Sequence, residues 1–316
     1  MTVQAIFEAI KVENAAAPYD TIHLKVFYPS LTAAPDPQQA PYKIVILFNG
    51  INCSLELYQW LAVKLAAQGL AVMTFSWVCQ NIPGIVAISP GVDLKQLTPD
   101  TYASGPTAAA LPTLLKALKQ LNTQSILAGL LDLQQIIVGG HSAGGRVAIE
   151  SATPQFFPEI VGAFAYGAHT AAGEQLGYPS GTILPLPDTL PLLLIGGTCD
   201  GVIASNGHYY GVNWEHPTTP IKRSFNEAIA GGRKDSYLLL LEGANHFTMT
   251  HPLDTTISTT DLDYPASKPE NQLRDLIAEI IILFIQAHVC DQPQASTRLN
   301  QYLEKPQPLI ATFEQK

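Results

Sequence analysis

Three residues of the chain could together carry out nucleophilic catalysis: Ser142, Asp200 and His246. Ser142 is the central residue of a Gly-x-Ser-x-Gly motif at positions 140–144. A serine hydroxyl is a poor nucleophile at neutral pH, so it needs a base within hydrogen-bond reach. That base in turn needs a group that fixes its tautomer and stabilises its cation. We therefore predict Ser142 as the nucleophile, His246 as the general base and Asp200 as the carboxylate that orients the base.

The segments around Ser142 favour a sharp turn between a strand and a helix. The apolar run 135–138 precedes the motif, and the helix-compatible segment 146–150 follows it. A serine on such a turn needs neighbours without side chains, because the strand and the helix approach each other closely there. This context predicts a nucleophile elbow at Ser142.

Asp200 and His246 each follow a predicted strand at its carboxyl end. Asp200 comes after the apolar run 192–195, and His246 comes after the run 236–241. In an open parallel sheet, reacting groups gather at the carboxyl ends of the strands. The order serine, aspartate, histidine along the chain is also the one expected of an α/β-hydrolase.

Other residues remain alternatives for two of these roles. Glu242 is the nearest other carboxylate, and His251 is a second histidine that could act as the base. Asp200 could instead only cap the turn that precedes Gly201, since aspartate is common in turns. Four further histidines are expected at surface, pocket-lining or structural positions: His208, His216, His23 and His288.

The oxyanion of a tetrahedral intermediate needs hydrogen-bond donors that are already in place. Such donors are typically the backbone N–H after the nucleophile and another from the loop after the first buried parallel strand. These positions correspond to Ala143 and Ile51. Gly50 would let the second loop turn tightly beneath the substrate carbonyl.

The apolar pattern predicts the elements that must position these residues. Segments 3–11 and 21–28 indicate an antiparallel strand pair. Segment 43–48 is apolar without alternation, which is typical of a strand buried on both faces. A helix over 54–68 then leads to a further buried strand at 70–75. This strand, helix, strand order favours a parallel sheet with right-handed crossovers.

Later segments continue this pattern as far as residue 289. Leucines at helical spacing over 111–121 predict a core helix, 160–166 predicts a strand, and 270–289 predicts a long helix that closes the sheet. The tail 290–316 contains three prolines and has no predicted position.

Two stretches, 76–105 and 203–232, are predicted as insertions over the carboxyl edge of the sheet, and both are candidate lid or pocket segments. Within the first, Trp77, Ile85 and Val86 could line a substrate pocket, or they could pack as a small core beneath a long loop.

Composition limits the class of partner. The 316 residues carry a formal net charge of -9, and no basic run stands out, so we expect neither nucleic acid nor an anionic membrane surface as a partner. Hydrophobic residues make up 47% of the chain and charged residues 14%, which suits a large core or a roomy apolar pocket. No break in composition suggests a second domain, so we predict one domain over 1–316 with its core at about 20–290.

The chain shows no secretory signal and no apolar run long enough to cross a bilayer, so we expect a cytoplasmic protein without integral membrane association. No Cys-x-x-Cys or His-x-x-x-His spacing suggests a metal, and we expect no cofactor. Cys53 and Cys79 each follow a predicted strand, which leaves a disulfide between them open.

The elbow, the acid and the base, together with the loop 48–51, resemble the α/β-hydrolase superfamily over about residues 20–290. Within it, the loop 50–58 and the segments 140–145 and 243–247 are similar to the branch of chlorophyllases, dienelactone hydrolases and polyester hydrolases. The chain also departs from that branch. Dienelactone hydrolases have cysteine at the position of Ser142, and chlorophyllases usually have arginine at the position of Ala143 and histidine at that of Asn49.

The resemblance implies an α/β-hydrolase fold, with a mostly parallel central sheet flanked by helices. It also implies a serine carboxylic-ester hydrolase that acts through an acyl-enzyme on a small hydrophobic ester, as in esterases, lipases or chlorophyllases. An acyltransferase or lyase on the same scaffold and a non-catalytic ligand-binding homologue are the alternatives. The oligomeric state is not predicted.

Overall fold

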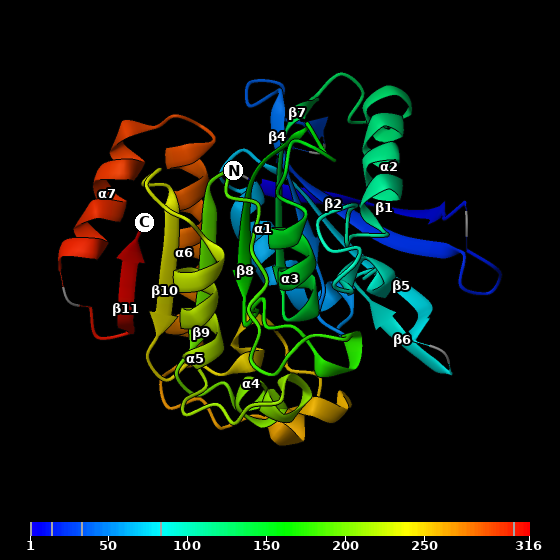
Figure 1. The fold of residues 1–316 in the computed structure, drawn as a ribbon. Helices are drawn as coiled ribbons and strands as arrows, with labels where there is room; N and C mark the ends of the chain where they lie inside the picture. The colour runs from blue at the N-terminus through cyan, green and yellow to red at the C-terminus, as the bar shows by residue number, and fades with distance from the viewer. Residues whose placement is uncertain (1, 14, 33, 83, 306) are drawn as a thin grey trace.

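The computed structural model describes residues 2–13, 15–32, 34–82, 84–305 and 307–316. These residues form a mixed α/β structure around one large sheet (Figure 1). Its strand order is β1-β2-β5-β4-β7-β8-β9-β10-β11, with β3 paired to β2 and β6 paired to β5. The central strands from β5 to β10 are parallel, and antiparallel strands flank them, which confirms a mostly parallel sheet. The strands are β1 (Thr2–Lys11), β2 (Thr21–Leu31), β3 (Ala34–Pro35), β4 (Tyr42–Phe48), β5 (Ala71–Ile82), β6 (Ile85–Ser89), β7 (Leu131–His141), β8 (Ile160–Tyr166), β9 (Leu192–Gly197), β10 (Ser236–Leu241) and β11 (Ile310–Gln315).

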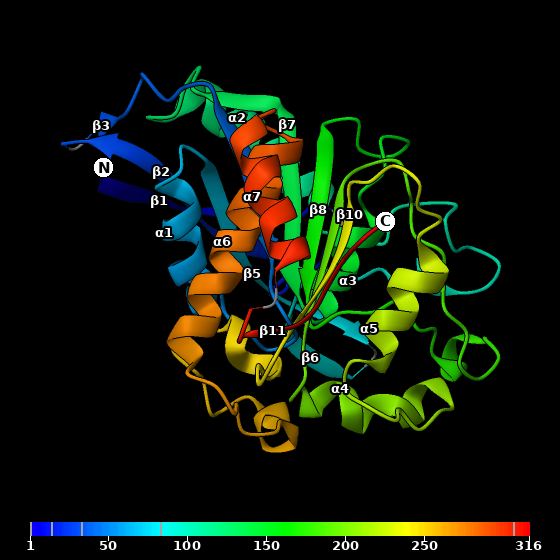
Figure 2. The same ribbon diagram turned by 90° about the vertical axis from the view of Figure 1, so that its left-hand side faces the viewer.

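Helices cover both faces of this sheet (Figures 1 and 2). Helices α1, α6 and α7 pack on one face, and α2, α3 and α5 pack on the other. The helices are α1 (Gln59–Ala66), α2 (Leu111–Gln124), α3 (Ala143–Glu150), α4 (Gly201–Ser205), α5 (Thr219–Arg223), α6 (Glu270–His288) and α7 (Pro293–Glu304). Shorter helical turns are η1 (Leu55–Tyr58), η2 (Leu94–Leu97), η3 (Glu174–Leu176), η4 (Asn206–Tyr210), η5 (Ser224–Ala228), η6 (His246–Met249) and η7 (Ser258–Leu262).

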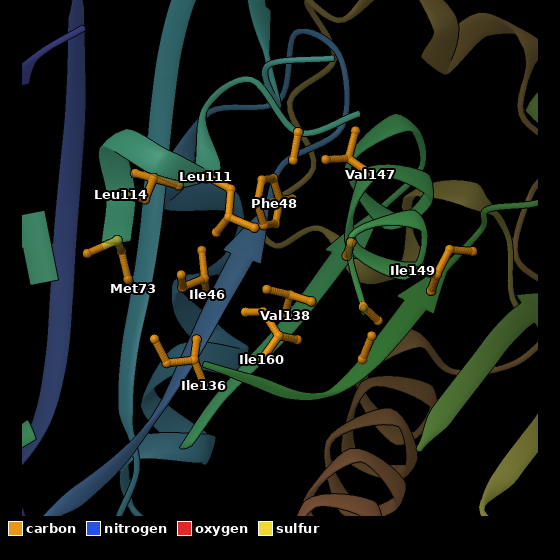
Figure 3. Packing of buried hydrophobic residues seen from close by; sticks show 14 of the residues in the cluster. Ile46, Phe48, Met73, Leu111, Leu114, Ile136, Val138, Val147, Ile149 and Ile160 are labelled. Atoms are coloured by element: carbon orange, nitrogen blue, oxygen red, sulfur yellow. The ribbon is translucent and has the colours of Figure 1, made fainter. Parts of the chain in front are cut away.

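Strand β4 explains why its segment is apolar at every position. Side chains alternate between the two faces of a sheet. Ile44 and Ile46 accordingly lie in one apolar core, and Val45 and Leu47 lie in the other. Figure 3 shows part of the first core, where Ile46 lies among side chains from the neighbouring strands and from α2. The sheet is therefore covered on both faces and fixes the strand ends that carry the candidate site.

The prediction that a strand ends at residue 75 and that 76–105 forms an insertion after it is wrong for the first part of that stretch. Strand β5 does not end at Phe75; it continues to Ile82 and pairs antiparallel with β6, so that Trp77 lies opposite Ser89. Gly84, with φ 81°, lies in the turn between the two strands. After Phe75, Trp77 is aromatic and Val78 is β-branched, and these types favour continuation of the strand.

The two other segments without a predicted shape are mainly helical. The stretch 203–232 forms short helical segments that include α5 and η5. In the tail, α7 packs against α6, and β11 pairs antiparallel with β10. The tail therefore extends the sheet at the edge next to β10, in a position that the sequence pattern did not indicate.

Two simpler features concern cysteines and membranes. Cys53 and Cys79 are both buried, and no disulfide joins them. Among the helices of the described residues, none combines the length and the apolar character that a bilayer crossing requires.

Candidate active site

Ser142 lies on the predicted sharp turn between β7 and α3. Its backbone has φ 55° and ψ -126°, a conformation that residues with a side chain rarely adopt. Holding a serine there costs about 1–3 kcal/mol, so the surrounding structure must enforce it. The Ser142 N–H donates to the carbonyl of Tyr166 over 2.8 Å, and the Ser142 carbonyl accepts from the N–H of Arg146 over 3.1 Å. These bonds attach the elbow both to β8 and to α3.

The glycines of the motif are required by close backbone contacts. A Cβ on Gly140 would lie 2.4 Å from the carbonyl oxygen of Gly144. A Cβ on Gly144 would lie 2.4 Å from the carbonyl oxygen of Asn49. Real Cβ atoms do not approach backbone so closely, so both positions exclude side chains. The second contact also shows that the elbow packs directly against the loop after β4, which carries Ile51.

Asp200 and His246 form a buried pair at the ends of neighbouring parallel strands. His246 Nδ1 lies 2.8 Å from one Asp200 carboxylate oxygen and 3.0 Å from the other. Asp200 is fully buried, and His246 is only 3% exposed. Asp200 also caps α4, since its carboxylate accepts from the N–H of Ile203 over 2.9 Å. The turn-capping alternative is therefore correct as well, and it does not compete with the contact to His246.

The pair fixes both the tautomer and the charge preference of His246. Because a carboxylate only accepts, the Nδ1–H donates to Asp200, and Nε2 is left to accept a proton. Burial alone would lower the pKa of His246, but attraction to Asp200 and the hydrogen bond to it outweigh burial and raise the pKa above its ordinary value. The imidazole is thus a stronger base than an isolated buried histidine.

One cavity of about 290 Å³ brings the predicted residues together. Ser142, His246, Ala143 and Ile51 all line it. Within the described part of the chain, no hydrogen bond joins Ser142 Oγ to His246, and such contacts are often long before a substrate binds. The structure therefore places Ser142 and His246 at the same cavity, with Asp200 hydrogen-bonded to the far nitrogen of His246.

The two expected oxyanion donors are available for a ligand. Ala143 is the first residue of α3, where backbone N–H groups have no partner inside the helix. The N–H of Ile51 has no hydrogen-bond partner among the described residues. A Cβ on Gly50 would lie 3.0 Å from His141 Nδ1, so His141 packs closely against this position. The loop turns here, since the N–H of Cys53 donates to the Gly50 carbonyl over 3.1 Å.

The alternative residues lie elsewhere. Glu242 and His251 are exposed and do not line the cavity. His208 and His216 are exposed in the region of α4 and α5, while His23 and His288 belong to β2 and α6, as expected. Trp77, Ile85 and Val86 do not line the cavity either; Trp77 is buried against Tyr19, and the other two are half exposed on the hairpin. From that stretch, Val92 and Leu94 reach the cavity instead.

Sequence reasoning missed a buried chain of hydrogen bonds behind the site. The Gly50 N–H donates to the hydroxyl of Tyr58 over 2.9 Å, and that hydroxyl lies 2.9 Å from His141 Nδ1. His141 Nε2 lies 3.1 Å from the backbone carbonyl of His246. A carbonyl only accepts, so Nε2 carries the proton and Nδ1 accepts from Tyr58. This single chain connects the Ile51 loop, the elbow and the loop of the base.

His141 is suited to this role because it stays neutral. Burial first, and then repulsion from His246, hold the pKa of His141 well below its ordinary value. The one signal in the sequence is that His141 directly precedes Ser142, and this position alone does not reveal its partners.

Asp263 is a second residue that sequence reasoning missed. One of its carboxylate oxygens accepts from the N–H of Gly201 over 2.9 Å, and the other accepts from the N–H of Phe247 over 3.1 Å. These residues directly follow Asp200 and His246, so Asp263 fixes the two loops relative to each other. Burial and repulsion from Asp200 raise the pKa of Asp263.

Comparisons with known proteins add no assignment to this geometry. No protein-family model matches the chain, and no curated protein matches it significantly.

Proposed function

We propose that the protein is a serine carboxylic-ester hydrolase with an α/β-hydrolase fold. One observation carries the proposal: Ser142, on a strained turn, shares a cavity with His246, whose Nδ1 is bound to the buried carboxylate of Asp200. Strain at a non-glycine residue is tolerated where the surrounding structure enforces it, and such residues cluster at functional sites. The parallel strands, which place all three residues at one edge of the sheet, support the fold.

Catalysis would proceed in two steps. Ser142 Oγ attacks the ester carbonyl carbon while His246 Nε2 takes the serine proton, and the N–H groups of Ile51 and Ala143 bind the oxyanion. The intermediate collapses as the bond to the alcohol oxygen breaks, and His246 returns its proton to the leaving alcohol. Water then attacks the acyl-enzyme and gives its proton to His246, and that proton passes to Ser142 Oγ as the acid leaves.

The walls of the cavity favour a small ester with apolar parts. Much of the lining is aliphatic: Ile51, Val92, Leu94, Val147, Val202 and Ile203. The volume of about 290 Å³ lies at the lower end of the range for small-molecule sites. A macrocycle of the chlorophyll type would have to remain outside, so we propose short or medium-chain esters as substrates.

Ester hydrolysis by the wild type and by Ser142→Ala tests the proposal. We expect wild-type turnover of short nitrophenyl esters, labelling of Ser142 by a fluorophosphonate, and a loss of at least about 1,000-fold in kcat for the variant. Full activity of Ser142→Ala, or a wild type that is neither active nor labelled, would contradict it. Measuring released acid against transfer of the acyl group to an added alcohol separates a hydrolase from an acyltransferase.

A further inference from the structure

A buried ion pair lines the same cavity as Ser142. Arg146 lies one helical turn after Ser142 on α3, and Glu150 lies one turn after Arg146. Both side chains line the cavity. Arg146 Nε donates to one Glu150 carboxylate oxygen over 2.8 Å, and the side chains are only 16% and 2% exposed. The pair is therefore a largely buried part of the cavity wall and not a solvent-exposed ion pair on the outside of the protein.

Each member of the pair has one polar group without a partner. Arg146 Nη1 donates to the carbonyl of Ala171 over 2.8 Å, but the buried Nη2 has no acceptor among the described residues. The second carboxylate oxygen of Glu150, Oε2, is likewise buried without a donor there. An unmatched polar group in the interior is costly, and more so when it is charged. The two atoms thus leave one donor and one acceptor unsatisfied beside the cavity, and a small shift of either side chain would present it to a ligand.

His169 adds a second donor to the cavity lining. Its Nδ1 accepts from the N–H of Ala171 over 3.2 Å, which leaves the proton of the neutral ring on Nε2. Burial, together with the positive charge of Arg146, lowers the pKa of His169 to about 3, so the ring is neutral at physiological pH. The Nε2–H can therefore only donate.

A hydroxyl group matches this arrangement better than a charged group does. A hydroxyl can accept from Arg146 or His169 and donate to Glu150 at the same time. A carboxylate would satisfy the donors but would repel Glu150, and an ammonium group would meet Arg146 and a donor-only His169. We propose that Arg146, Glu150 and His169 form a subsite for a hydroxyl group on the ester substrate. This inference rests on the proposed ester hydrolysis and specifies its substrate class.

The subsite lies a short distance from the reacting serine. One turn of α-helix advances about 5.4 Å, so the backbone of Arg146 is displaced from Ser142 by roughly that distance along α3. A hydroxyl a few bonds from the scissile carbonyl would reach it. Both the acyl part and the alcohol part of an ester could carry that hydroxyl, and matched substrates distinguish the two.

Ester pairs that differ only by hydroxyl against methyl test the proposal on the wild type. For the acyl part the pairs are ethyl 3-hydroxybutyrate with ethyl 3-methylbutyrate, and ethyl 6-hydroxyhexanoate with ethyl heptanoate. For the alcohol part they are 2-hydroxyethyl with propyl butyrate, and 4-hydroxybutyl with pentyl butyrate. We expect kcat/KM to favour the hydroxyl ester at least about tenfold in one or more pairs, because hydrogen bonds to charged groups discriminate by that order. Ratios near one in all four pairs would overturn the subsite.

A double variant tests which residues cause the preference. Replacing a buried ion pair by apolar residues of similar size is often tolerated by the fold, so Arg146→Met with Glu150→Leu removes the charges together. We expect the hydroxyl-to-methyl ratio to fall to about one. The control is the same replacement at Arg223 and Glu227, an i,i+4 pair of the same kind that lies outside the cavity lining, and it should keep the wild-type ratio.

The outcomes separate this inference from the proposed function. If wild-type protein hydrolyses the methyl-bearing esters and Ser142→Ala does not, ester hydrolysis stands whatever the ratios are. A preference that survives in a folded double variant would refute the role of Arg146 and Glu150. If the double variant does not fold, the test rests on the hydroxyl-to-methyl ratios of kcat/KM for the wild type and for Glu150→Gln. In Glu150→Gln we expect that ratio to fall at least threefold.

Discussion

Ser142 is held in a conformation that suits glycine better than serine. Its φ of 55° and ψ of -126° place a Cβ where the backbone resists one, and hydrogen bonds to β8 and α3 keep it there. A strained turn of this kind projects the side chain away from the strand and the helix that flank it. The strain therefore lowers the stability of the fold, while the turn holds the Ser142 hydroxyl group clear of the flanking strand and helix.

This strain predicts an inverted order of stability for two variants of Ser142. Ser142→Gly relieves the strain, whereas Ser142→Ala keeps the Cβ that causes it. We expect the glycine variant to have the larger free energy of unfolding, by about 1 kcal/mol, in urea denaturation with equal m-values.

The control for this comparison is Ala9→Gly in β1, an exposed strand position without strain, where glycine should cost about 0.5–1 kcal/mol. If Ser142→Gly were also less stable than Ser142→Ala, the elbow would not be strained.

The raised pKa of His246 predicts the acid side of the pH profile. A protonated imidazole cannot accept the serine proton, so activity is lost as the pH falls through the pKa of His246. Because Asp200 raises that pKa, the midpoint in kcat/KM should lie above the ordinary value of about 6.5.

In Asp200→Asn, burial is opposed only by the weaker attraction to Asp263, so the midpoint should move below 6.5 and kcat should fall by about 10,000-fold. Glu242→Gln serves as the matched control and should leave the profile unchanged. If Glu242→Gln moved the midpoint and Asp200→Asn did not, Glu242 would be the carboxylate that acts on His246, and the assignment of Asp200 would be wrong.

Ser142, Asp200 and His246 could be predicted because each stands at a recognisable place in the chain. A glycine-rich turn after an apolar run, and polar residues directly after two later runs, are local patterns. Tyr58 and His141 carry no such pattern. Their roles depend on side chains that meet only after β4, β7 and the loop of His246 are assembled, and a single sequence does not encode those contacts in its spacing.

At the scale of elements, the loop after β4 is fixed by one tyrosine. The hydroxyl of Tyr58 binds the N–H of Gly50, next to the expected oxyanion donor Ile51, and it also binds His141. Both contacts are buried. The position of the proposed oxyanion donor Ile51 therefore depends on η1, which ends at Tyr58.

Tyr58→Phe should weaken catalysis more than binding. It removes the partner of two buried groups, which should cost about 1–3 kcal/mol of stability, and it frees the loop that carries Ile51. We expect kcat to fall about 10- to 100-fold with little change in KM, since oxyanion contacts are strongest in the transition state.

A matched control comes from the far side of the molecule. The hydroxyl of Tyr237 lies 2.9 Å from His288 Nε2, so Tyr237→Phe also removes a tyrosine–histidine bond but lies outside the cavity lining. Equal losses of kcat in both variants would mean that the effect of Tyr58 is only a loss of stability.

The helices and strands could be predicted well where the apolar periodicity was strong, and poorly where the periodic stretch was short. The run 43–48 had to be a strand buried on both faces, and α2 and α6 follow from leucine and isoleucine spacing. The extension of β5 into the hairpin with β6 was missed because its alternation, with Trp77 and Cys79 buried and Val78 and Gln80 exposed, is too short to predict a strand by itself. Such a hairpin is specified by pairing between its own two strands.

At the scale of the whole molecule, the sheet is completed by a segment remote in sequence from its centre. Strand β11 covers the edge of β10, and Phe313 stacks on Tyr237 with ring centroids 5.8 Å apart. The Lys316 ammonium group donates to the carbonyls of Phe225, Asn226 and Ile229. Alternation in β11 is weak because the strand is only half buried, and this explains why the sequence did not place it.

Deletion of residues 305–316 should expose β10 as an unpaired edge. Open edges pair with other chains, so we expect a lower melting temperature and concentration-dependent aggregation in size-exclusion chromatography. The milder Phe313→Ala should cost about 2 kcal/mol without aggregation, because pairing of the backbone is retained. A deletion variant that stays monomeric with an unchanged melting temperature would show that β11 is dispensable.

The pairing of the outermost strands has a practical consequence for attachment to a surface. Thr2 lies opposite Ser30, close to where β2 meets the first residues of β5, and the Lys316 N–H binds the carbonyl of Ser236 at the start of β10. Both positions lie at the amino edge of the parallel strands, whereas Ser142 and His246 follow the carboxyl edge. Immobilisation through either position would leave the cavity facing the solution, whereas a linker at the exposed Ile51 would obstruct its mouth.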